Sequence, residues 1–222
     1  NYVSLQEVNS IQEDVKEAIK EGAGSDIIEP DANGKVIKNN YIASVLTINP
    51  DVVGWLKINE TNIDYPVVQS SDNDYYLKHN LYNETDKNGW IYMDYRNSSY
   101  EMDANTIIFG HNMYYSGIMF GTLANAYKKS WYSNPENQII SFDTIYESNQ
   151  YQIFSIYKIP KSTDYLKTYF ADDNEFIEFV NLIKGRSVND FGIEVNPGDK
   201  ILTLSTCSNH SDRLVVHAKL IT

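Results

Sequence analysis

Short apolar runs separated by short polar stretches constrain this chain more than any other feature of its sequence. The runs have the length and the β-branched or aromatic content typical of strands. They cover residues 55–58, 63–68, 89–93, 106–110, 138–142, 151–158, 200–205 and 214–221. Many short strands joined by polar turns favour a sheet that closes on itself, because closure removes unpaired edges. The sequence therefore predicts a mainly β fold, a closed or nearly closed barrel of about eight strands with peripheral helices.

Helical periodicity appears in a few segments around these runs. Near the start, apolar residues recur at steps of three and four, at Val8, Ile11, Val15, Ala18 and Ile19. This spacing predicts an amphipathic helix that ends at Gly22. Shorter helices are expected at 41–46 and 120–126, and a longer one at 174–184 with its apolar face against the sheet.

Composition excludes several classes of partner and of fold. Thirty acidic residues outnumber 18 basic ones, and the net charge of −12 repels phosphate backbones, so we expect no nucleic-acid partner. The sequence contains no apolar run of about 18 residues, the length a transmembrane helix requires. The single cysteine cannot form an internal disulfide.

That cysteine, Cys207, ends one of the predicted strands, and Arg213 opens the next. A guanidinium close to a thiol favours the thiolate, and it can stabilise the oxyanion formed when the thiolate attacks a carbonyl. The pair therefore predicts a nucleophile and its electrostatic partner. The alternative is a buried structural cysteine with a surface arginine.

A thiol nucleophile needs an acid or base, and four histidines are available. His111 follows the strand 106–110, so it should reach the rim of the sheet. His210 lies in the loop between Cys207 and Arg213 and is the second choice. His217 lies inside the last strand, where a structural role is favoured, and His79 lies in a polar region expected at the surface.

Metal and cofactor sites are not expected. Cys207 and His210 have the spacing of two metal ligands, but a zinc site needs three or four, and the sequence offers no further cysteine and no His-x-x-x-His pair. Glycine-rich phosphate-binding loops and the Gly-x-Ser-x-Gly elbow are also missing. We therefore predict no metal and no organic cofactor.

The candidate residues occur within motifs that resemble those of class B sortases, the cysteine transpeptidases of Gram-positive surfaces. The resemblance runs from about residue 40 to the end of the chain and includes the Phe109-Gly-His111 sequence. The other motifs are Asn49-Pro-Asp-Val-Val-Gly-Trp55, Tyr65-Pro-Val-Val-Gln69, Met93-Asp-Tyr-Arg-Asn97 and Thr203-Leu-Ser-Thr-Cys207 followed by Arg213.

The resemblance implies an eight-stranded sortase-type β-barrel with N-terminal helices and a helix in the connection before the seventh strand. Residues 1–40 would be an N-terminal helical extension and linker, and residues 41–222 the catalytic domain. By the same resemblance, Cys207 would be the nucleophile, His111 the acid and base, and Arg213 the oxyanion stabiliser. Five further residues would line the groove for the sorting signal: Asn73, Leu77, Tyr165, Leu166 and Ser205.

The activity that this resemblance implies is cleavage of a C-terminal sorting signal through a thioester, followed by transfer of the surface protein to an amine. The amine would belong to a peptidoglycan precursor or to a pilin. A membrane anchor upstream of this sequence would hold the enzyme at the extracellular face of the cell membrane. The alternatives are a cysteine peptidase that hydrolyses such a signal without transfer, and a non-catalytic surface-binding module.

Two positions depart from the family pattern. Only five residues separate Cys207 from Arg213, and this loop is shorter than the one expected in class B enzymes. Phe109 stands where the family often has a tyrosine, which removes one hydroxyl. Both departures bear on substrate preference and neither touches the three predicted catalytic residues.

Overall fold

The protein is described by a computed structural model that covers residues 2–22, 30–207 and 212–222. Its central element is a β-sheet. Within those ranges the strands are β1 (Val52–Ile58), β2 (Asp64–Val68), β3 (Tyr92–Met93), β4 (Asn105–Met113), β5 (Ile118–Met119), β6 (Ile139–Thr144), β7 (Gln150–Pro160), β8 (Ile201–Cys207) and β9 (Asp212–Leu220).

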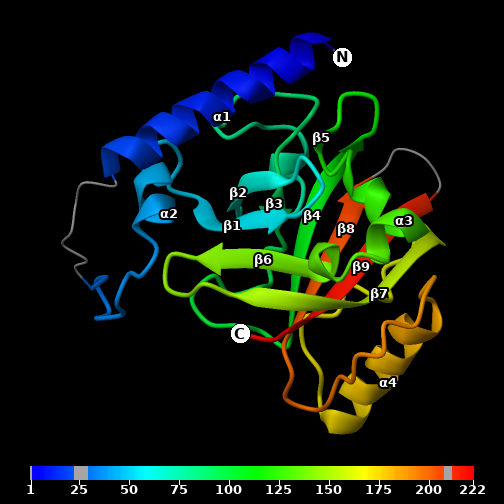
Figure 1. Ribbon diagram of the computed structural model, residues 1–222. Helices are drawn as coiled ribbons and strands as arrows, with labels where there is room; N and C mark the ends of the chain where they lie inside the picture. The colour runs from blue at the N-terminus through cyan, green and yellow to red at the C-terminus, as the bar shows by residue number, and fades with distance from the viewer. Residues whose placement is uncertain (1, 23–29, 208–211) are drawn as a thin grey trace.

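The strands form one sheet in the order β3-β2-β1-β6-β7-β9-β8-β4-β5. β3 also pairs with β4, so eight of the strands close into a barrel and β5 extends from β4 outside the ring. Most neighbouring strands are antiparallel, but β2 runs parallel to β3, and β4 runs parallel to β8. Figure 1 shows β4 and β8 side by side, with β9 next to β8. The predicted eight-stranded barrel is confirmed.

Helices cover the outside of this barrel (Figure 1). In the described ranges they are α1 (Tyr2–Gly22), α2 (Asn40–Val45), α3 (Lys129–Tyr132) and α4 (Asp173–Gly185), with 3₁₀ turns η1 (Tyr75–Leu77), η2 (Leu123–Tyr127) and η3 (Pro135–Gln138). α1 buries the predicted apolar positions Val8, Ile11 and Val15 in the same cluster as the barrel core. The N-terminal helix is therefore packed on the barrel.

α4 lies in the connection before β8, which is the seventh strand of the barrel in chain order, as predicted. The Asp172 side chain caps its first turn by accepting a hydrogen bond from the Glu175 amide at 2.9 Å. The expected apolar face is buried in a second hydrophobic cluster, through Phe176, Phe179, Val180 and Ile183. α4 thus fixes the long connection between β7 and β8 to the barrel.

One predicted helix takes a different form. The segment 120–126 was expected to be helical, but only the 3₁₀ turn η2, Leu123–Tyr127, is present. Met119 has a left-handed backbone, with a φ of 51°, and a Cβ on Gly121 would lie 2.5 Å from the carbonyl oxygen of Met113. The chain is therefore in a tight turn where the helix would have to begin.

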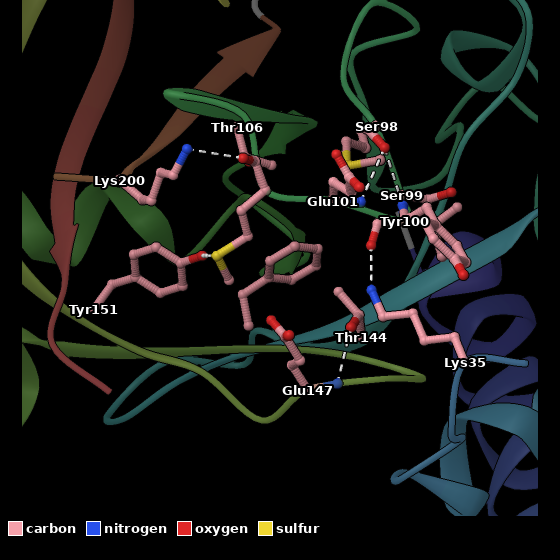
Figure 2. A pocket seen from close by; sticks show the side chains of 14 residues that line it. Lys35, Ser98, Ser99, Tyr100, Glu101, Thr106, Thr144, Glu147, Tyr151 and Lys200 are labelled. Atoms are coloured by element: carbon pink, nitrogen blue, oxygen red, sulfur yellow. Dashed lines mark hydrogen bonds between the residues drawn. The ribbon is translucent and has the colours of Figure 1, made fainter. Parts of the chain in front are cut away.

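The segment after α1 is attached at one end of the barrel. Lys35 Nζ donates to the Tyr100 carbonyl at 2.5 Å and lies 4.3 Å from the centre of the Tyr100 ring. Both residues line a pocket of about 310 Å³ that also reaches Thr106 and Lys200, near the starts of β4 and β8 (Figure 2). His111 lies five residues beyond Thr106, about 17 Å further along β4. The pocket therefore lies near the opposite end of β4 from His111.

Candidate active site

His111 and Cys207 lie side by side at the carboxyl ends of two parallel strands. In the ladder between β4 and β8, the Cα partner of His111 is Cys207. Neighbouring strands are about 4.8 Å apart, so residues 96 positions apart in sequence come within reach of each other. β4 continues to Met113 instead of ending at Gly110, because His111 still pairs with β8 and the two residues after it pair with β5. The side chain of Cys207 lies outside the described part of the structure.

The imidazole of His111 is oriented by a backbone carbonyl. Its Nε2 lies 2.8 Å from the carbonyl oxygen of Leu77. A carbonyl oxygen can only accept, so Nε2 carries the proton and donates it. This bond fixes the tautomer and leaves Nδ1 as the nitrogen that can exchange a proton with a substrate.

A glycine, Gly89, also packs closely against the Leu77 carbonyl. Gly89 has a left-handed φ of +56°, and a Cβ built on it would lie 2.4 Å from the carbonyl oxygen of Tyr76 and 2.9 Å from that of Leu77. Only glycine fits this position without displacing those carbonyls. The close backbone contact therefore helps to set the acceptor that His111 uses.

Arg213 lies at the start of β9, on the other side of β8. The antiparallel register ends with the pairing of Ser205 and Val215, and Cys207 and Arg213 each lie two residues beyond this pair on their own strands. Thr206 Oγ1 accepts from the Leu214 amide at 2.9 Å, which extends the connection between the strands toward this end. The backbone positions of the predicted catalytic residues thus lie on three adjacent strands at one end of the barrel.

Two predicted groove residues lie in the segment between β2 and β3. Leu77 is half-buried, and its carbonyl holds His111. The Asn73 amide is used at both ends, because Nδ2 donates to Asp94 Oδ2 at 3.1 Å and Oδ1 accepts from the Tyr95 amide at 3.0 Å. The side chain of Asn73 is therefore fixed relative to the loop after β3.

The other predicted groove residues differ in their exposure. Tyr165 and Ser205 are fully buried, with their hydroxyl oxygens 2.9 Å apart. The Tyr165 hydroxyl also accepts from Arg213 Nη1 at 3.5 Å. Leu166 is half-buried, and its carbonyl accepts from Arg96 Nη2 at 3.1 Å. The structure thus brings Tyr165 and Ser205 to Arg213, while Leu166 lies nearer the surface.

Sequence reasoning missed the ion pair that joins these segments. Arg96 donates to Asp94 through Nε at 2.8 Å and through Nη2 at 2.7 Å, and the Asp94 side chain is fully buried. Burial alone would raise the pKa of Asp94, but the hydrogen bonds from Arg96 outweigh it and hold that pKa below its usual value. The pair connects Asn73 on one side with the Leu166 carbonyl on the other. Both residues lie in the motif Met93-Asp-Tyr-Arg-Asn97. In the sequence, the ion pair is indicated only by an aspartate and an arginine two positions apart.

The other histidines have separate surroundings. His217 is fully buried and hydrogen-bonded to Tyr157 and Thr203, in agreement with the structural role favoured for it. His79 is half-buried, with its ring stacked on Tyr75 at 4.0 Å. His210, the second choice for the acid and base, lies outside the described residues.

Neither a metal site nor a membrane span is found within the described ranges. There, no group of three or more His, Cys, Asp or Glu residues could hold a metal ion. The same ranges contain no helix whose length and apolar character would let it cross a bilayer.

Comparison with known proteins identifies the class that this barrel and its rim define. The sortase domain family matches residues 56–221, which is most of the chain. The chain therefore belongs to the sortase family, whose members are cysteine transpeptidases.

The relatives are class B enzymes, which confirms the resemblance seen in the motifs. The chain is 36% identical to Sortase B of Listeria monocytogenes over 201 residues, covering 89% of this chain and 80% of that protein. It is 37% identical to Sortase B of Staphylococcus aureus over 182 residues, covering 80% of this chain and 73% of that protein. Sortase B homologues are enzymes of the cell surface.

Solved structures agree in fold over the full length. The structure of a Staphylococcus aureus sortase B–substrate complex aligns with a TM-score of 0.84 and 31% identity, covering 100% of this chain and 99% of that one. Sortase B complexed with triglycine aligns with a TM-score of 0.85 and 31% identity, covering 98% of each chain.

Proposed function

We propose that this protein cleaves a C-terminal sorting signal of surface proteins and transfers them to an amine of the cell wall or of a pilin. The observation that carries the proposal is the ladder pairing of His111 with Cys207, with Arg213 near the start of the next strand, β9. A nucleophile, a proton carrier and an oxyanion stabiliser are what acyl transfer through a thioester requires.

The first half of the reaction forms the acyl-enzyme. The thiolate of Cys207 attacks the carbonyl carbon of the scissile peptide bond, and the guanidinium of Arg213 stabilises the negative oxygen that develops. His111 then gives a proton to the departing amine. The C–N bond breaks, and the amino-terminal part of the substrate remains as a thioester on Cys207.

The second half transfers the acyl group. His111, now neutral, takes a proton from the incoming amine, which attacks the thioester carbonyl. Collapse of the tetrahedral species forms a new amide and releases the Cys207 thiolate. No metal or organic cofactor enters either half.

We place the sorting signal between the two walls that the Asp94–Arg96 pair connects. Asn73 and Leu77 would lie on one wall, and Leu166 on the other, with Tyr165 and Ser205 beside Arg213. The sortase B complexes with a substrate and with triglycine support a peptide donor and an acceptor with a free amine. The net charge of −12 favours a cationic acceptor over nucleic acid.

We further propose that the enzyme acts at the extracellular face of the cell membrane, held there by a segment N-terminal to the sequence printed above. The cell-surface setting of its homologues supports this placement.

The test is turnover of a fluorogenic peptide that carries a sorting signal, with and without added triglycine. The proposal expects an amide product in the presence of triglycine and no turnover by Cys207→Ala. Release of acid alone, with no amide, would identify a peptidase instead. A Cys207 that reacts with no thiol reagent near neutral pH, together with no turnover, would identify a binding module.

A further inference from the structure

The Tyr165 hydroxyl joins the proposed catalytic arginine to the barrel interior. It lies 2.9 Å from Ser205 Oγ and accepts from Arg213 Nη1 at 3.5 Å. Arginine can only donate, so the phenol oxygen accepts from Arg213, while either hydroxyl can be the donor in the bond between Tyr165 and Ser205. Arg213, Tyr165 and Ser205 are thus connected by consecutive hydrogen bonds.

The Tyr165 ring itself has little freedom. It is fully buried, and it makes edge-on contacts with Tyr157 and His217, each at a centroid distance of 6.4 Å. The chain next to it is anchored on both sides, because Arg186 pairs with Asp164 at 2.5 Å and Arg96 holds the Leu166 carbonyl. The hydroxyl is therefore presented to Arg213 from a fixed point.

We propose that Tyr165 is a positioning residue that sets the guanidinium of Arg213 for the transition state, and that it does not act by binding the sorting signal. This inference rests on the proposed function. A fully buried ring offers no surface for the peptide, whereas its hydroxyl reaches Arg213 directly. An arginine side chain has many rotamers, and one fixed acceptor lowers the cost of holding it where the oxyanion forms.

Loss of the Tyr165 hydroxyl should affect turnover more than substrate binding. An oxyanion stabiliser acts when charge develops on the carbonyl oxygen, so its misplacement lowers kcat more than it raises KM. Tyr165→Phe removes only the hydroxyl, and we expect about a tenfold fall in kcat with KM changed by less than about twofold. Ser205→Ala removes the second hydrogen-bond partner of the Tyr165 hydroxyl, and should also lower kcat, but by less.

The matched control is Tyr157→Phe. Tyr157 is also fully buried and in the same hydrophobic cluster, but its hydroxyl is bonded to His217. The same deletion there should leave kcat and KM unchanged while lowering the melting temperature. An equal fall in kcat in both variants would mean that Tyr165→Phe acts through a general loss of packing, and would overturn the proposal.

A double-mutant cycle tests the route through Arg213. In an Arg213→Lys background, which keeps the charge and loses the planar fork, Tyr165→Phe should cause no further fall in kcat. A rise in KM as the main effect of Tyr165→Phe, or a full additional loss in the Arg213→Lys background, would mean that Tyr165 contacts the substrate and would refute the inference.

A measurement without substrate distinguishes failure of this inference from failure of the proposed function. In a ¹H–¹⁵N spectrum of arginine side chains, the Arg213 guanidinium signal is assigned by its loss in Arg213→Lys. It should shift or broaden in Tyr165→Phe and stay in place in Tyr157→Phe. An unchanged signal in Tyr165→Phe contradicts positioning whatever the enzyme turns over, while a shifted signal in a protein without transfer activity contradicts only the proposed function.

Discussion

The burial of His217 predicts that the free energy of unfolding falls as the pH is lowered below 6.5. Its Nδ1 lies 2.8 Å from Thr203 Oγ1, whose proton is donated to Asn105 Oδ1 at 2.7 Å. Nδ1 therefore carries the imidazole proton, and Nε2 accepts from the Tyr157 hydroxyl at 2.9 Å. The network is complete with a neutral ring, and a second proton on Nε2 would displace the hydrogen bond that the Tyr157 hydroxyl donates.

The magnitude follows from the pKa of His217. Burial of the ring, with a smaller effect from the positive charge of Arg186, lowers this pKa from 6.5 to about 3. Between these values the unfolded chain binds a proton that the folded protein does not bind. Each pH unit then removes a little over 1 kcal/mol, so from pH 7 to pH 5 the free energy of unfolding should fall by roughly 2 kcal/mol.

Urea denaturation monitored by tryptophan fluorescence at pH 7, 6 and 5 measures this slope. Most carboxylates remain ionised in both states over that range, so the histidines dominate the change. His217→Gln removes the titrating group, and the pH dependence in the variant should be shallower by roughly 2 kcal/mol over the range. His79→Gln makes the same substitution outside this network and serves as the control.

The refuting result is a His217→Gln protein whose free energy of unfolding falls with pH as steeply as that of the original protein. It would mean that the folded state accepts the proton on His217. The hydrogen-bond directions assigned to Thr203 and Tyr157 would then be wrong.

Two further predictions concern the rim of the barrel. Gly89→Ala should lower kcat by displacing the Leu77 carbonyl. The control is Gly192→Ala, where φ is a similar +67° but no atom lies near the added Cβ, so this variant should only lose about 1–2 kcal/mol of stability through backbone strain. Equal kcat values of the two variants in peptide turnover would contradict this prediction. Arg96→Ala should lower the free energy of unfolding by roughly 3 kcal/mol in urea titration, because the buried Asp94 loses its partner; a loss below about 1 kcal/mol, the size typical of surface pairs, would contradict it.

The strands of the barrel were predictable because each has a local signature. Apolar runs with short polar turns gave all eight barrel strands to within a few residues, and the apolar face of α4 matched its burial. β5 was missed because its two residues, Ile118–Met119, are too few for an alternating pattern. The helix expected at 120–126 failed because the tight turn at Met119 and Gly121 overrides local propensity.

The candidate site was predictable only in part. Strand ends pointed to Cys207 and His111, but no local pattern shows that β4 and β8 are parallel neighbours in register. Their pairing is a long-range property of the closed sheet, and the expected proximity came from the resemblance to sortases. The roles of the individual residues stay predictions.

Contacts of buried polar groups were beyond sequence reasoning. Tyr165 was assigned to the groove, and nothing in its neighbours along the chain indicates full burial beside Ser205. The Asp94–Arg96 pair was visible as a spacing, but its two partners come from segments more than 20 residues away in either direction. Such networks depend on which segments the fold brings together.

Mass spectrometry of the enzyme during turnover shows whether Cys207 carries the substrate as a thioester. Rapid acid quenching of the protein with a sorting-signal peptide should trap an adduct with the mass of the amino-terminal part of the peptide, located on Cys207 by proteolysis. Added triglycine should deplete this adduct and produce the corresponding amide. A turning-over enzyme that never carries the adduct, or carries it on another residue, would contradict the account.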